Sequence, residues 1–233
     1  EFPNNRKVLV DGYHRLTALV QYGKPLLAVL VTYHVNNEQE LAERYAKIDR
    51  PAVRKPKDML RAFGVEEKAQ LSAKMLNAVS AGVAIVANDF PRHSGSNAAK
   101  SLIQRTHNVD AWLSEGQTYA ACIAGCTSEI NMLLLRGPVI AVALATLRYQ
   151  PGMAEQFWTQ IAADDGLLKD SPQGRLLAWL RATRVNKIGG QFMYSRYVAG
   201  AWNAYFQGRT LKFLKIADPS APVTIAGTPY GKE

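Results

Sequence analysis

From about Glu66 onward, apolar residues recur at helical spacing almost without interruption, and this pattern most constrains how the chain can fold. Such spacing puts an apolar stripe on each helix, and the stripes must be buried against one another. An all-α helical domain is therefore expected over residues 65–217. Its helices are predicted at Lys68–Val86, Val109–Leu113, Tyr119–Leu135, Val139–Tyr149, Met153–Ala163, Arg175–Thr183 and Tyr194–Gln207.

The first part of the chain has a different pattern. Lys7–Val10 predicts a strand, Tyr13–Tyr22 a helix that ends at Gly23, and Leu26–Tyr33 a second, Val-rich strand. A strand, a helix and a strand within about thirty residues form a compact α/β unit. Asn36 or Asn37 then follows as the cap of another helix.

The expected fold class is therefore α+β, with a small α/β domain followed by a larger all-α domain. The α/β domain is assigned to residues 1–64, and the helical domain begins at residue 65. The tail over residues 218–233 contains several prolines and glycines, so it is expected to be extended or loosely ordered.

Positive charge is concentrated in two stretches of the chain. The net charge is +9, within a composition that is 48% hydrophobic and 20% charged and so typical of a globular protein. Arg44–Arg61 holds seven basic residues and two acidic ones, and Arg181–Lys215 holds seven basic residues and no acidic one. Clustered cations suit phosphate contact, because each neutralised phosphate releases counterions. A solvated basic surface is the alternative.

Eight basic residues in these stretches are candidate nucleic-acid contacts. They are Arg54, Lys55, Lys57, Arg61, Arg184, Lys187, Arg196 and Arg209. Aromatic residues between the later ones could stack on single-stranded bases. However, Tyr194, Tyr197, Ala201 and Tyr205 fall at helical spacing, which favours packing in the core.

The junction Asp11-Gly12-Tyr13-His14-Arg15 combines chemistry that suits a phosphate group. A helix N-terminus after a strand presents backbone N–H groups and a partial positive charge. Gly12 permits close approach to the backbone, and Arg15 can hold phosphate oxygens with its planar guanidinium. His14 could act as an acid–base group near neutral pH, and Asp11 could cap the helix or hold a metal ion.

The Asp11-Gly12-Tyr13-His14-Arg15-Leu16 stretch, followed by Ala18, resembles the G-x-H-R signature of the ParB/sulfiredoxin superfamily, in its DGQHR form from phages and plasmids. The resemblance implies that Gly12, His14 and Arg15 contact the phosphates of ATP or CTP with Mg²⁺. Arg50 fits the arginine of a second phosphate-binding element, although the Glu-Asn pair of that element is missing. Tyr13 stands where sulfiredoxin has its reactive cysteine, which excludes sulfiredoxin chemistry.

Two functions from different classes remain open after this resemblance. The first is a ParB-like nucleotide- and nucleic-acid-binding protein of a phage or plasmid, with DNA as its partner. Its enzymatic form is a nucleotide hydrolase or nuclease, with His14 as acid–base group and Asp11 as the Mg²⁺ ligand. The second is a non-catalytic protein that uses its helical domain to inhibit or bridge a host protein. The resemblance also implies that the N-terminal part of the domain is missing, and a homodimer stays open.

The remaining features predict a cytoplasmic protein without a membrane partner. The longest apolar stretch, Gly137–Leu147, is too short to span a bilayer. Cys122 and Cys126 are four residues apart, so on one helix they would share a face as buried thiols.

Overall fold

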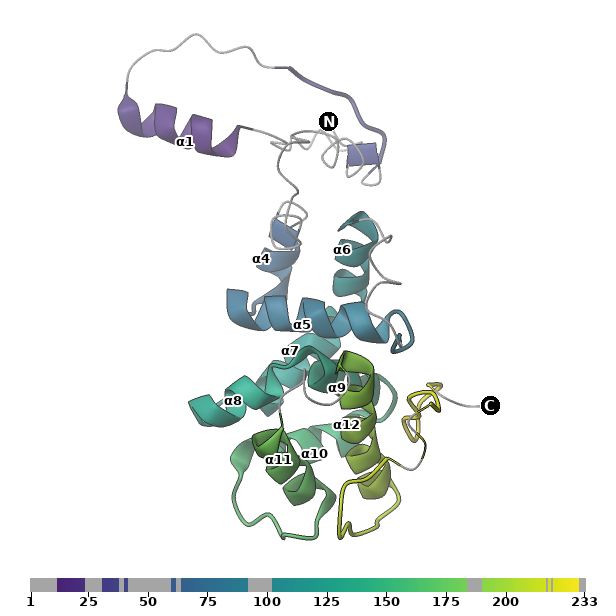
Figure 1. Cartoon of the computed structure of the whole chain (residues 1–233). Helices are drawn as coiled ribbons and strands as arrows, with labels where there is room; N and C mark the ends of the chain where they lie inside the picture. Colours follow the sequence, from purple (N-terminus) through teal and green to yellow (C-terminus); the bar gives the residue numbers. More distant parts are fainter. Residues whose placement is uncertain are drawn as a thin grey trace.

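The computed structural model describes part of the chain, in several ranges. These are residues 12–23, 31–37, 40–41, 60–61, 64–91, 102–183, 190–216, 218 and 220–230. Ten helices are described within them (Figure 1). They are α1 (Tyr13–Tyr22), α4 (Val65–Ala69), α5 (Ala73–Val86), α6 (Leu102–Ala111), α7 (Leu113–Cys122), α8 (Ser128–Leu134), α9 (Gly137–Tyr149), α10 (Pro151–Ala163), α11 (Pro172–Ala182) and α12 (Gly190–Phe206).

Helix α9 lies at the centre of the helical body. Every residue from Pro138 to Leu147 is buried, because α5, α7, α10 and α12 all pack against this helix. Its sequence is apolar on all sides, as expected for a helix surrounded by protein. Pro138 lies in its first turn, where the missing N–H group breaks no helical hydrogen bond.

The tightest crossing of two helices joins α5 to α9 at Gly82. An ideal Cβ atom on Gly82 would lie 2.5 Å from Cγ2 of Ile140 and 3.1 Å from the backbone nitrogen of Ala141. No larger residue fits this position without a shift of one helix. A glycine inside α5 therefore sets how closely the two helices approach.

Aromatic side chains from three helices fill the core beside α9. Phe157 packs edge-on against Trp158 and Trp202, with ring centroids 4.9 and 5.5 Å apart. The indole nitrogen of Trp158 donates to the hydroxyl of Thr146 over 3.1 Å, and the hydroxyl of Tyr119 donates to a backbone carbonyl of α8. These buried polar atoms are hydrogen-bonded, as burial requires.

Most predicted helices are confirmed, but Val109–Leu113 spans the junction between α6 and α7, and two longer predicted helices are broken in the structure. The pattern over Lys68–Val86 is divided between α4 and α5, and Ser72 caps α5 by accepting a hydrogen bond from the Met75 N–H. The pattern over Tyr119–Leu135 is divided between α7 and α8, and Thr127 caps α8 in the same way. Both breaks end in a serine or threonine cap, which is a helix-start signal in the sequence.

The second break changes the interpretation of the two cysteines. Helix α7 ends at Cys122, and Cys126 lies beyond the following turn, so they do not share a helix face. Both are free thiols; Cys122 is buried and Cys126 is half-buried. Burial raises the pKa of both thiols, which makes them poor nucleophiles.

The C-terminal segment over residues 220–230 is irregular but is held against the helices. The Asn203 side chain donates to the Thr224 carbonyl over 2.8 Å and accepts from the Ala226 N–H over 2.7 Å. The indole nitrogen of Trp202 donates to the Ala226 carbonyl, and Val223 and Ile225 are buried. These contacts with α12 therefore order the segment. The composition of the tail had predicted a loosely ordered segment.

The predicted α+β fold class is wrong for the part of the chain that the structure describes. That part contains helices and irregular segments and no strand. In the predicted strand Leu26–Tyr33, residues 31–33 are irregular, and the side chains of Val31 and Tyr33 are 61% and 51% exposed. Val-rich runs form strands only when a neighbouring strand and a packed face support them. The predicted strand Lys7–Val10 lies outside the described residues.

The N-terminal helix prediction is confirmed. Helix α1 covers Tyr13–Tyr22 and ends at Gly23, which has the left-handed conformation and whose N–H group donates to the Leu19 carbonyl. The predicted cap at residue 37 is confirmed too, since the Asn37 side chain accepts from the Glu40 N–H over 2.8 Å.

Helix length and hydropathy decide whether a helix can cross a membrane. Among the described residues, no single helix is both long and apolar enough to cross a membrane. Helices α8 and α9 reach that length and hydropathy only as a pair, and they are bent by 76° at their junction.

Candidate nucleic-acid interface

Gly12 is the first residue of the predicted phosphate motif that the structure describes. It precedes α1 with φ of 88°, a left-handed conformation that glycine adopts without steric cost. Its carbonyl accepts a hydrogen bond from the Leu16 N–H, and as a glycine it has no side chain with which to cap α1. The positive end of the helix dipole therefore lies at the position where the motif predicts a phosphate.

The other motif residues are described only in part. His14 and Arg15 lie in the first turn of α1 by their backbone, and their side chains lie outside the described atoms. Asp11, predicted to act in catalysis and to hold a metal ion, lies outside the described residues, as does Arg50. The expectation of ATP or CTP with Mg²⁺ at this motif therefore stays a prediction.

The predicted nucleic-acid contacts are spread over the chain. Arg54, Lys55, Lys57, Arg184 and Lys187 lie outside the described residues. Arg61 is exposed. Helix α1 lies at one end of the drawn molecule, whereas the chain that contains Arg209 follows α12 at the other end (Figure 1). The structure therefore does not bring the N-terminal motif and Arg209 together.

Arg196 lies inside α12 and is half-buried. Its guanidinium carbon lies 5.8 Å from the ring centroid of Phe192, a cation–π distance. One of its terminal nitrogens, Nη1, is buried and has no hydrogen-bond partner among the described residues. This arginine is thus partly used in packing rather than fully available to a ligand.

Several other arginines of the helical body are neutralised by acidic residues. Arg148 donates to Glu115 over 2.7 Å and lies on the ring of Trp112, and Arg175 pairs with Asp170. The first pair joins α9 to α7, and the second joins α11 to the chain just before it. The charges of these two arginines are therefore not free for an anionic partner.

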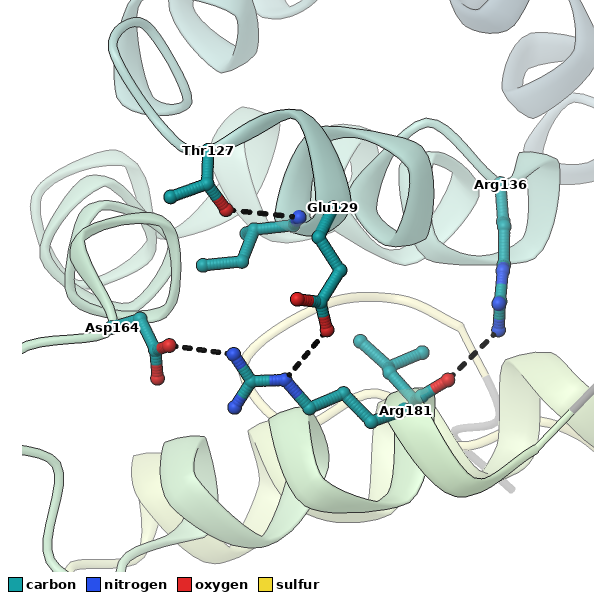
Figure 2. A network of polar contacts seen from close by, with 7 residues as sticks. Thr127, Glu129, Arg136, Asp164 and Arg181 are labelled. Atoms are coloured by element: carbon teal, nitrogen blue, oxygen red, sulfur yellow. Dashed lines mark hydrogen bonds and ion pairs between the residues drawn. The ribbon is translucent and has the colours of Figure 1, made fainter.

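Arg181 shows the same use of charge most clearly (Figure 2). Its Nε donates to Glu129 of α8 over 3.1 Å, and its Nη2 donates to Asp164, which follows α10, over 2.6 Å. This hydrogen bond to the Asp164 carboxylate is the main cause that raises the pKa of Arg181. In the same view Arg136 donates to the Leu180 carbonyl at the end of α11.

The segment over residues 207–215, which we call the basic loop, is different. Arg209, Lys212 and Lys215 are all exposed, and none of them forms an ion pair with another described residue. The side chain of Phe213 is 68% exposed, and the Lys215 ammonium lies 5.3 Å from its ring centroid. Three cations that no described acidic residue pairs with therefore lie close together in the sequence of this loop.

Sequence reasoning identified Arg209 in this loop but did not identify Phe213 as an exposed aromatic residue. It placed Tyr194, Tyr197, Ala201 and Tyr205 on one helix face that packs in the core. The burial of Tyr194 and Ala201 is confirmed. Tyr197 stacks on Trp179 with ring centroids 4.6 Å apart. Gly208 is the sequence signal that separates Phe213 from the helical residues. A glycine after a long helical pattern marks the helix end, so Phe213 lies beyond the helix.

Comparison of the chain with protein-family models, with curated proteins and with solved structures finds no match in any of the three. The resemblance to the ParB/sulfiredoxin superfamily therefore rests on the motif residues at 11–16 and stays a prediction. What the chain does has to be argued from its own geometry and charge.

Proposed function

We propose that this protein binds nucleic acid mainly through the sugar–phosphate backbone, with the basic loop as its principal contact. One observation carries the proposal. Arg148, Arg175 and Arg181 of the helical body are paired with acids, whereas Arg209, Lys212 and Lys215 stay exposed without an acidic partner among the described residues.

This arrangement favours an anionic partner for an energetic reason. Unpaired lysine and arginine side chains that neutralise phosphates release condensed counterions, and that release drives binding. Contacts of this kind position a protein on nucleic acid without reading its sequence. The proposed binding is therefore tolerant of sequence and strongly dependent on salt.

The N-terminal turn of α1 is the second phosphate contact in the proposal. Support comes from the left-handed Gly12 and the position of Arg15 in the same turn. A bound nucleotide raises the melting temperature of the folded protein by mass action. A melting panel with ATP, CTP, GTP and UTP plus Mg²⁺, on wild type and Arg15→Ala, tests this contact: a shift that Arg15→Ala abolishes supports it.

Salt-dependent binding to a labelled oligonucleotide tests the main proposal. The double variant Arg209→Ala/Lys212→Ala should weaken binding and lower the slope of log K against log salt by roughly 0.7 to 0.9 for each phosphate that is no longer neutralised. Lys68→Ala/Lys74→Ala is the charge-matched control, because it removes two exposed cations on α4 and α5, of which Lys68 pairs with Asp110. Equal effects of both pairs, or a flat salt dependence in wild type, would contradict the proposal.

A protein partner is the second candidate, and one feature favours it. Helix α1 exposes Leu16 and Val20, one turn apart, with 44% and 83% of these side chains accessible. Neighbouring exposed apolar residues on one helix face are typical of contact surfaces for other proteins. Val20→Glu should abolish such an interaction and leave oligonucleotide binding by the basic loop unchanged.

A further inference from the structure

We propose that the basic loop is a binding platform for single-stranded nucleic acid, in which Phe213 stacks on an unpaired base. Arg209, Lys212 and Lys215 then contact the phosphates on either side of that base. This inference rests on the proposed function and makes it more specific, because it names the class of nucleic acid.

Hydrogen bonds hold the backbone of the basic loop in place over its first half, residues 208–211. At the end of α12, the Gly208 N–H donates to the Tyr205 carbonyl and the Arg209 N–H donates to the Ala204 carbonyl, over 2.9 and 2.8 Å. Further along, the Leu211 N–H donates to the Asp170 carbonyl, and the Leu211 carbonyl accepts from Arg175 over 3.0 Å. The loop is therefore a fixed support for its exposed side chains.

Side-chain packing then separates an inner and an outer face of the loop. Leu211 and Leu214 are half-buried, and Leu214 packs against the hydrophobic core. Lys212, Phe213 and Lys215 are exposed between and after them. Because the leucines anchor the loop, the exposure of the large Phe213 ring follows from the fixed backbone.

The nearby acidic residues do not neutralise the loop. Asp170, whose carbonyl binds Leu211, uses its carboxylate to pair with Arg175. The Asp218 carboxylate accepts hydrogen bonds from the N–H and the hydroxyl of Ser220, and it forms no ion pair with Arg209, Lys212 or Lys215 among the described residues. The three cations around Phe213 are consequently available to phosphates.

The aromatic ring is the feature that selects single strands. Phosphates alone attract duplex and single strand alike, but bases in a duplex are already stacked on each other and present only their edges. An exposed aromatic ring gains a stacking partner only from a base that is free of the duplex. Cations next to a stacking ring are the combination found where proteins bind single strands without sequence preference.

Fluorescence anisotropy with two probes, a labelled oligothymidylate and a labelled duplex of equal length, tests the inference on the full chain. Wild type should bind the single strand more tightly. Phe213→Ala and Phe213→Leu should each weaken single-strand binding about tenfold and leave duplex binding unchanged, whereas Phe213→Tyr should retain it. Leucine keeps apolar bulk without an aromatic face, so the comparison isolates stacking from packing.

The outcomes separate this inference from the proposed function. If Phe213→Leu binds both probes like wild type while Arg209→Ala/Lys212→Ala weakens both, the platform is overturned and the backbone-binding function stands. If wild type binds neither probe, both are overturned. Equal affinity of wild type for the two probes also overturns the platform.

Discussion

Gly82 of α5 faces Ile140 of α9 at a distance that leaves no room for a side chain, since a Cβ atom would lie 2.5 Å from Cγ2 of Ile140. The burial of residues 138–147 of the central helix α9 depends on this approach. Sequence periodicity marks Gly82 only as a weak position in a helix. Its packing role becomes visible only when the helix on the other side is known.

Gly82→Ala should destabilise the protein, although alanine is the better helix former. The added methyl group forces α5 away from α9, and overpacking of this kind costs about 1–3 kcal/mol. Gly152→Ala is the matched control, because nothing lies within 4 Å of its Cβ position in α10. Urea unfolding of both variants checks this, and a stabilised Gly82→Ala would contradict the close approach.

Asn203→Ala should release the C-terminal segment from α12. The change leaves the Thr224 carbonyl without its donor and the Ala226 N–H without its acceptor, and each lost hydrogen bond costs about 0.5–1.5 kcal/mol. Hydrogen exchange at Ala226 should become faster in the variant, with Gln207→Ala, an exposed position, as control. Unchanged exchange at Ala226 would show that other contacts hold the segment.

Arg181→Ala should lower stability by a modest amount that depends on salt. The side chain is 40% exposed, so its ion pairs with Glu129 and Asp164 together contribute about 0.5–1 kcal/mol at low ionic strength. High salt should shrink the difference from wild type in thermal unfolding. Arg209→Ala, which removes an exposed arginine without an ion pair among the described residues, should leave the unfolding free energy unchanged.

Alkaline pH should destabilise the fold in part through Tyr230. Burial is the main cause that raises the pKa of Tyr230 from 10.0 to about 12. The folded state then holds this proton more tightly than the unfolded state, so stability is complete below pH 10 and falls as the pH rises through 12. Tyr230→Phe should remove about 2 kcal/mol of this loss.

Urea unfolding at a series of alkaline pH values measures the effect. The pKa values of Tyr119, Tyr194 and Tyr205 are also raised, because burial disfavours the phenolate. These three tyrosines contribute to the loss of stability at alkaline pH in both wild type and Tyr230→Phe. Parallel stability curves for wild type and Tyr230→Phe would show that Tyr230 does not take part.

The sequence by itself determined most of the helices and several of their ends. Helices α9, α10 and α11 lie within three residues of their predicted limits, and Gly23 ends α1 as expected. These features depend on short-range chemistry, namely the periodic placement of apolar side chains and the conformations that glycine permits. Side chains three and four residues apart decide them, so they can be predicted without knowing the rest of the fold.

Tertiary structure decided what the local pattern could not. Residues 31–33 are as apolar as a strand, but no described strand lies beside them, so this part of the α/β expectation failed. The tail is more ordered than its composition predicts, because the side chains of Asn203 and Trp202 form hydrogen bonds with its backbone. Phe213 became exposed because Leu211 and Leu214 anchor the loop around it. Each of these outcomes depends on partners far away in the sequence, and a pattern of neighbouring residues contains no information about them.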